Sequence, residues 1–274
     1  MGNPMPTKMT IDRFTALKAE RKIVCLTAYS APMAAILDPH CDLLLVGDSV
    51  AMVLYGMDNT QGADIDMMIR HAQAVMRGAK QALVVVDLPA GSYEANPEKA
   101  LTTAKQIMQE SGADAVKLEG GAVLQPHIKL LVENGIPVVG HIGLLPQKAS
   151  SASMYRITGK TADEAALLHA DMTALVDAGV FSIVMEGIIE PVAKAIATAC
   201  SVPTIGIGAS TACDGQILVT DDMVGLFDKF VPTFVRQFGQ LNPAITEAVG
   251  AYRAAVIDGS FPAKEHMFWP KPEK

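Results

Sequence analysis

The chain has 274 residues, and 50% of them are hydrophobic, which is enough to bury a large core. Its formal net charge is -7 and no block of lysine and arginine stands out, so nucleic acid is not expected as the main partner. The apolar runs are short, which argues against a membrane span, and the N-terminus MGNPMPTKMT lacks an apolar signal core. We therefore expect a cytoplasmic protein whose four separated cysteines are free thiols.

The first predicted element is an amphipathic helix within residues 10–22. Short apolar runs that predict β-strands then recur along the chain. They cover residues 22–29, 42–48, 82–89, 115–121, 137–143, 181–187 and 203–209. An eighth and weaker strand is predicted at residues 222–227, and CDGQILVTDD just before it is interpreted as a loop with a short turn.

Two of the intervening segments carry clear helix signals. In the first, Asn96 is a plausible N-cap, Pro97 occupies the first helical position and Gly112 ends the helix. In the second, Thr161 caps the N-terminus and Gly179 closes the helix. Helices therefore alternate with the predicted strands.

The strands are nearly continuous apolar runs, which is typical of a parallel sheet covered on both faces. Seven or eight β-α units predict an α/β fold, a (β/α)8 TIM barrel that forms a single domain over residues 1–274. The helix within residues 10–22 would close the N-terminal mouth, the bottom of this barrel. An open doubly wound sheet is the alternative, but TAYSAPM follows the first strand where that fold usually has a glycine-rich loop.

Polar residues occur at the ends of successive predicted strands. In a (β/α)8 barrel these ends meet at the C-terminal face, where function resides. The residues are Asp48 and Ser49 on the second strand, Asp87 on the third, Lys117 and Glu119 on the fourth, His141 on the fifth and Glu186 on the sixth.

These residue types suggest a particular chemistry. Asp48, Asp87 and Glu119 form a set of hard oxygen ligands that suits Mg²⁺ better than Zn²⁺. At least one of the three is expected to act through water, because Mg²⁺ usually takes only one or two protein carboxylates. Lys117 supplies a positive charge for a substrate carboxylate or oxyanion, and Glu186 is left as the general base.

Each residue also has a purely structural interpretation. Asp48 and Asp87 could cap helices or form turns, and Glu119 could form a salt bridge with Lys117. His141 could form a hydrogen bond inside the barrel, and Glu186 could be a solvated loop residue. The succession of polar strand ends favours the functional interpretation.

The longer motifs resemble the ketopantoate hydroxymethyltransferase family from the first strand to Phe268. They are LLVGDSVAMVLYG, VVDLPAGSYEANPEKAL, GADAVKLEGG, VVGHIGLLPQ, IVMEGI, TIGIGAS with CDGQILV after it, and GSFPAKEHMF. The resemblance implies a (β/α)8 barrel that transfers a hydroxymethyl group from 5,10-methylenetetrahydrofolate to 3-methyl-2-oxobutanoate. The product would be 2-dehydropantoate, in pantothenate biosynthesis, and Mg²⁺ would stabilise an enolate. The resemblance also implies a homo-oligomer, a decamer of two pentameric rings.

Carried over motif by motif, the resemblance implies a metal site, substrate contacts and catalytic residues. Asp48 and Asp87 would bind the metal, Glu119 would act through water, and Ser49 and Lys117, with the two aspartates, would contact the substrate. Glu186 would be the catalytic base, and Lys117 and His141 would lie in the same pocket.

The chain departs from the family pattern in two loops and at the end of the seventh strand, which reads GIGAS where the family has GIGAG. TQGADI at residues 60–65 replaces a TLPVT-like run, and residues 148–160 lack the usual paired glycines. We expect these changes to affect folate affinity more than ketoacid affinity.

Two alternative functions remain at this point. One is a Mg²⁺-dependent lyase or mutase of the isocitrate lyase/phosphoenolpyruvate mutase type that acts on another 2-oxo acid. No KKCGH-like segment of such lyases occurs in the sequence. The other alternative is a non-catalytic barrel.

Overall fold

The computed structural model describes residues 7–149, 155–227 and 231–270. Within the chain, residues 1–220 and residues 221–274 form two compact units. The expectation of a single domain over residues 1–274 stays a prediction. Residues 1–6, and residues 150–154 of the unusual loop 148–160, lie outside the described part of the chain.

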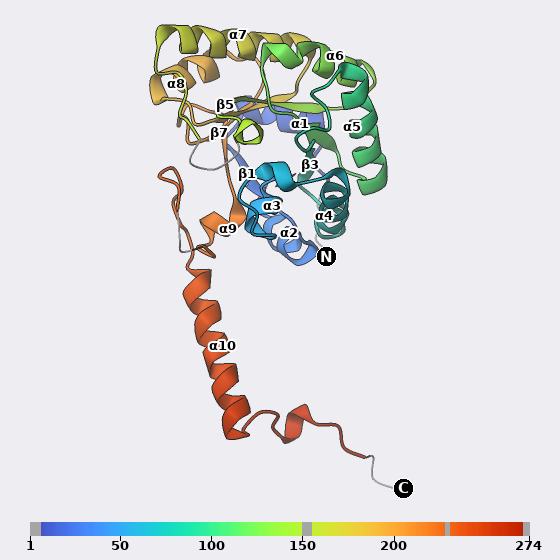
Figure 1. Ribbon diagram of the computed structural model, residues 1–274, viewed down its shortest axis with the longest axis vertical. Coiled ribbons are helices and arrows are strands. Elements are labelled where there is room, and N and C mark those ends of the chain that lie inside the picture. Colours follow the sequence, from blue (N-terminus) through green and yellow to red (C-terminus); the bar gives the residue numbers. More distant parts are fainter. Residues whose placement is uncertain (1–6, 150–154, 228–230, 271–274) are drawn as a thin grey trace. The chain divides into compact units, whose positions relative to one another are not determined.

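In the first unit the described strands pair in parallel and in sequence order, and they close into a barrel through pairing of the last strand with the first (Figure 1). This confirms the predicted (β/α)8 fold. The strands are β1 Ile23–Thr27, β2 Leu43–Val46, β3 Leu83–Asp87, β4 Ala115–Lys117, β5 Val138–Gly143, β6 Ser182–Glu186, β7 Thr204–Ile207 and β8 Gly215–Leu218.

Helices follow the strands and cover the outside of the barrel. They are α2 Ala31–Leu37, α3 Val50–Val53, α4 Ile65–Gly78, α5 Pro97–Ser111, α6 Gln125–Glu133, α7 Ala162–Ala178 and α8 Glu190–Ala199. Short 3-10 turns cover Leu17–Ala19, Thr60–Gly62, Ala122–Leu124 and Pro146–Lys148.

The predicted helix caps are confirmed. Asn96 accepts a hydrogen bond from the backbone N–H of Lys99 at 2.8 Å, and Gly112 adopts a left-handed φ of 76°. Thr161 caps α7 in the same way, and Gly179 ends it with a φ of 93°. The local signals at both ends therefore define these helices as expected.

The predicted eighth strand was wrong. β8 lies at Gly215–Leu218, inside the segment interpreted as a loop, while residues 222–227 fall in the end of α9 (Thr220–Met223) and a turn at Gly225. β8 is short, and its residues alternate in burial instead of forming an apolar run. Gly215 also lets the strand approach β1 closely, because a Cβ at this position would lie 2.6 Å from the carbonyl oxygen of Ile23.

The N-terminal helix closes the bottom of the barrel, as predicted. It comprises α1, Ile11–Ala16, and the 3-10 turn that follows. Phe14 and Leu17 are fully buried and pack with inward-facing side chains of the strands. The ring of Phe14 meets the ring of Phe181 edge to face at 5.7 Å. The opposite, C-terminal end of the barrel is left for the site.

The second unit contains α10, Leu241–Asp258. None of the residues of α10 is buried, and several large apolar side chains on it are exposed. They include Ile245, Val249, Tyr252, Val256 and Ile257. No helix among the described residues is long and apolar enough to cross a membrane.

Candidate active site

The barrel brings together the charged residues predicted at the strand ends. Asp87 and Lys117 are direct neighbours in the register of β3 and β4. The Nζ atom of Lys117 lies 3.0 Å from Oδ1 of Asp87 and 4.0 Å from Oε1 of Glu119. The predicted pair of Lys117 and Glu119 therefore exists, but Asp87 is the closer partner of the lysine.

His141 connects this pair to the sixth strand. Its Nδ1 atom lies 3.5 Å from Oε1 of Glu119, and its Nε2 atom lies 3.4 Å from Oε2 of Glu186. The side chain of Glu186 is 16% exposed, whereas those of His141 and Glu119 are 2% and 3% exposed. Of these three side chains, Glu186 is the one that a substrate can reach most easily.

Asp48 joins the cluster from the end of β2. Its backbone N–H donates to Oδ2 of Asp87 at 3.1 Å, and its Oδ2 atom accepts a hydrogen bond from the amide of Gln147 at 2.8 Å. The backbone N–H of Gln147 donates to Glu119 at 3.0 Å. Gln147 thus links two carboxylates, Asp48 through its side chain and Glu119 through its backbone.

Gln147 is in turn held by Tyr93, whose hydroxyl donates to Oε1 of Gln147 at 2.6 Å. Neither residue had been assigned a role from the sequence. The family-like motif VVGHIGLLPQ, which ends in Pro146-Gln147, was the available signal for Gln147. The unusual segment 60–65 reaches the same place, because the side chain of Gln61 donates to the carbonyl oxygen of Gln147 at 2.9 Å.

Ser49 stands next to Asp48 in the chain, at the start of α3. Its hydroxyl lies 2.7 Å from the hydroxyl of Tyr29. Gly47 lets the backbone pass close by, because a Cβ there would lie 2.7 Å from Oγ of Ser49. The serine is half-buried, so its hydroxyl lies at the edge of the carboxylate cluster.

The charges of the cluster shift several pKa values. Burial lowers the pKa of Lys117, but the carboxylates of Asp87, Glu119 and Asp48 outweigh it and raise that pKa above its usual value. Burial and Lys117 lower the pKa of His141, but its contacts with Glu119 and Glu186 raise it to about 9. Both shifts favour the protonated form, while the 3.3 Å approach of Nζ of Lys117 to Nδ1 of His141 opposes two positive charges side by side.

The pKa of Asp48 is also raised, but in a carboxyl group this shift favours the uncharged form. Burial raises its pKa well above the usual value, and the charges of Asp87 and Glu119 raise it further. Four carboxyl groups share this cluster with one lysine and one histidine. Full ionisation would leave a negative excess, which a bound cation would neutralise.

The donor set fits Mg²⁺. Oδ1 of Asp87 is buried and its one close charged partner among the described residues is Lys117 at 3.0 Å, so this oxygen can still turn toward a cation. No group of three His, Cys, Asp or Glu side chains in the described part is already arranged as a metal cage. Mg²⁺ does not require one, because it usually binds through one or two carboxylates together with waters and substrate oxygens.

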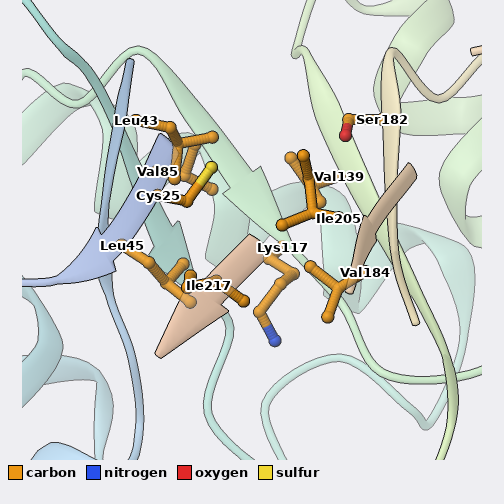
Figure 2. A pocket seen from close by; sticks show the side chains of 10 residues that line it. All are labelled: Cys25, Leu43, Leu45, Val85, Lys117, Val139, Ser182, Val184, Ile205 and Ile217. Atoms are coloured by element: carbon orange, nitrogen blue, oxygen red, sulfur yellow. The ribbon is translucent and has the colours of Figure 1, made fainter. Parts of the chain in front are cut away.

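The barrel interior beneath this cluster is tightly packed. Figure 2 shows the apolar stem of Lys117 among inward-facing side chains such as Val184 and Ile217, with its ammonium directed away from Leu43 and Val85. The hollow that remains there measures about 10 Å³, which is no larger than one water needs. Substrate must therefore bind above Lys117, at the C-terminal face.

Comparison with known proteins identifies the family of the chain. The sequence pattern of a family described as ketopantoate hydroxymethyltransferase matches residues 8–264. The chain is 50% identical over 273 residues to a protein of Brucella canis called 3-methyl-2-oxobutanoate hydroxymethyltransferase, and the match covers 99% of both chains. A Rhizobium etli protein with the same name is 50% identical over 265 residues, which is 97% of both chains.

Solved structures resemble the fold at much lower identity. A 2,3-dimethylmalate lyase of the PEP mutase/isocitrate lyase superfamily has a TM-score of 0.59 at 18% identity and covers 97% of this chain and 93% of its own. A phosphonopyruvate hydrolase in complex with oxalate and Mg²⁺ has a TM-score of 0.58 at 13% identity and covers 94% and 93%. At these identities the likeness establishes the shared barrel fold alone.

Proposed function

The chain belongs to the ketopantoate hydroxymethyltransferase family, and from this premise we propose that the cluster around Lys117 is its active site. The enzyme transfers a hydroxymethyl group to 3-methyl-2-oxobutanoate, which gives 2-dehydropantoate in pantothenate biosynthesis. The lyase and mutase alternative is not favoured, because those proteins share only the fold.

We propose 5,10-methylenetetrahydrofolate as the one-carbon donor and Mg²⁺ as the metal. Asp48 and Asp87 would hold the metal, and Glu119 would reach it through water. When bound, Mg²⁺ supplies positive charge beside the keto oxygen of the substrate. The negative excess of the buried carboxyl groups supports this assignment.

The other residues of the cluster would bind the ketoacid, remove its proton and position the base. Lys117 would bind the carboxylate of the ketoacid, while Ser49 at the edge of the cluster would contact the same substrate. Glu186 would accept the proton from the carbon beside the ketone onto its carboxylate. His141, whose Nε2 atom lies 3.4 Å from Oε2 of Glu186, would hold that carboxylate in position.

The bond changes balance without an oxidant. A C–C bond forms between the deprotonated carbon and the methylene carbon of the donor. Both C–N bonds that join this carbon to N5 and N10 of the folate break, and water supplies the hydroxyl oxygen. The proton taken up by Glu186 and the remaining proton of the water end on the two folate nitrogens. The open position of Glu186 beside His141 is the single observation that carries this proposal.

One assay separates the candidate functions. Purified protein is incubated with 3-methyl-2-oxobutanoate and Mg²⁺ in D₂O, with and without the folate donor. The transferase exchanges the proton beside the ketone in both cases and forms 2-dehydropantoate only with the donor. A lyase would split other 2-oxo acids without a folate, and a non-catalytic barrel would neither exchange nor transfer.

We also propose a homo-oligomer in the cytoplasm, with the decamer implied by the family resemblance as its form. The exposed apolar side chains of α10 support association, because burying them removes apolar surface from water. Light scattering on the purified chain gives the oligomeric mass directly. A monomer at micromolar concentration would contradict this proposal.

A further inference from the structure

A second hollow lies beside the carboxylate cluster. It measures about 210 Å³, and Leu144, Leu145, Ala149 and Tyr155 contribute apolar walls to it. The backbone N–H of Leu144 donates to the carbonyl oxygen of Glu186 at 2.8 Å. The hollow therefore borders the strand end that carries the proposed base.

Two cations line the same hollow. Lys148 and Arg156 are both exposed, and within the described residues neither forms an ion pair with a carboxylate. Both charges are therefore available to an anionic ligand at the rim of the hollow. The hollow thus combines an apolar wall with positive charge at its rim.

Tyr155 connects the hollow to the catalytic cluster. It is half-buried, and its hydroxyl donates to Sδ of Met52 at 3.8 Å. Burial raises its pKa to about 12, and the charges of Glu186, Asp48 and Glu119 contribute. Its ring lines the hollow while the carboxylates of the site lie near enough to affect its hydroxyl.

We propose that this hollow binds the one-carbon donor, with a flat ring of the folate against Tyr155 and Leu144 and the glutamate carboxylates on Lys148 and Arg156. The inference rests on the proposed function, because it assigns the second substrate of the same site. A complete ligand site usually measures roughly 300 to 1,000 Å³, so the hollow takes part of the donor. The acidic tail then lies at the exposed rim, beside the two cations.

The location also fits the reaction. The donor has to bring its carbon next to the carbon that Glu186 deprotonates, and the hollow adjoins Glu186 through the backbone of Leu144. The small ketoacid is assigned to Lys117, which does not line this hollow. An anionic ligand with an aromatic body matches the remaining surface.

The test uses the full-length Lys148→Ala and Arg156→Ala variants and the double variant. Lys194→Ala on α8 is the matched control, because it removes one exposed cation outside the hollow. Each contact to a carboxylate at an exposed rim is worth roughly 2- to 5-fold, so the double variant should raise the donor KM on the order of ten-fold. The KM of the ketoacid and the KM values of the control should change less than about two-fold.

A second donor identifies the contact itself. Methylenetetrahydropteroate lacks the two glutamate carboxylates and keeps only the benzoate carboxylate, so its KM should already be higher with the wild-type protein and should rise less with the double variant than that of the folate donor. Equal losses for both donors, or a donor KM in the double variant equal to that of the control, would overturn the assignment.

Proton exchange on the ketoacid alone keeps this result distinct from the proposed function. A wild-type protein that does not exchange contradicts the proposed function. A protein that exchanges normally, but whose donor KM is the same in the wild type and in the double variant, contradicts only the inference about the hollow.

Discussion

The sequence predicted the charged residues of the site but not Gln147, which connects two of them. The charged residues came together as expected, because the ends of parallel strands in a barrel share one face. Their metal, substrate and base roles stay predictions. Gln147 was not predicted, because its hydrogen bonds to Asp48 and Glu119 depend on how a loop folds back over the barrel. An uncharged side chain in such a loop gives no signal of its partners.

We expect Asp48 to destabilise the metal-free protein and to be required for Mg²⁺ binding. Because burial raises its pKa in the folded protein, the charged form is unfavourable there without a cation. Asp48→Asn should therefore raise the melting temperature of the metal-free protein by about 2 to 4 °C for each kcal/mol gained. The same variant should lose most of the stabilisation that added Mg²⁺ gives to the wild type.

Thermal unfolding with EDTA and with a Mg²⁺ series checks both effects. Glu98→Gln on the exposed start of α5 is a suitable control, since it removes one exposed carboxylate that is not part of the cluster. A wild-type response to Mg²⁺ in Asp48→Asn would exclude this aspartate as a ligand.

At the level of elements, β8 shows the limit of pattern recognition. Seven strands were predicted from apolar runs, and all seven are present with shorter bounds. β8 has four residues, of which Gln216 is exposed, so no apolar run marks it. Its position is fixed by pairing with β1 and β7 on either side, which is a constraint of barrel closure and not of local sequence.

Gly215 should be essential to that closure. An alanine Cβ would lie 2.6 Å from the carbonyl oxygen of Ile23 and 2.8 Å from Cδ1 of Ile205. Gly215→Ala should therefore destabilise the barrel by about 1 to 3 kcal/mol, as overpacking of a tight core does. Urea unfolding followed by circular dichroism measures the loss.

Gly250→Ala provides the comparison for the same chemical change. Gly250 lies within α10, and a Cβ there meets no neighbouring atom. Alanine should favour the helix by about 0.5 to 1 kcal/mol. If Gly215→Ala were as stable as the wild type, the close approach of β8 and β1 would not hold in solution.

At the scale of the whole molecule, the four free, buried cysteines report whether the protein is folded, because their thiols are protected from solvent in the native state. Burial, with the nearby charges of Asp42 and Asp38, raises the pKa of Cys41 to about 11. At pH 8 this thiol is almost entirely protonated, and the thiolate is the form that reacts. Native protein should thus react slowly with Ellman's reagent, and unfolding in urea should release all four thiols. Fast reaction of one thiol in native protein would show that the barrel opens locally around it.

The proposed mechanism depends most on Glu186 as the base. Glu186→Gln keeps the size of the side chain but removes the group that accepts the proton. The decisive experiment follows hydrogen–deuterium exchange at the carbon beside the ketone of 3-methyl-2-oxobutanoate, in D₂O with Mg²⁺ and without a donor. The variant should exchange about 10²- to 10⁴-fold more slowly than the wild type, while the ketoacid dissociation constant stays nearly unchanged. Exchange at the wild-type rate in Glu186→Gln would contradict its role as the base.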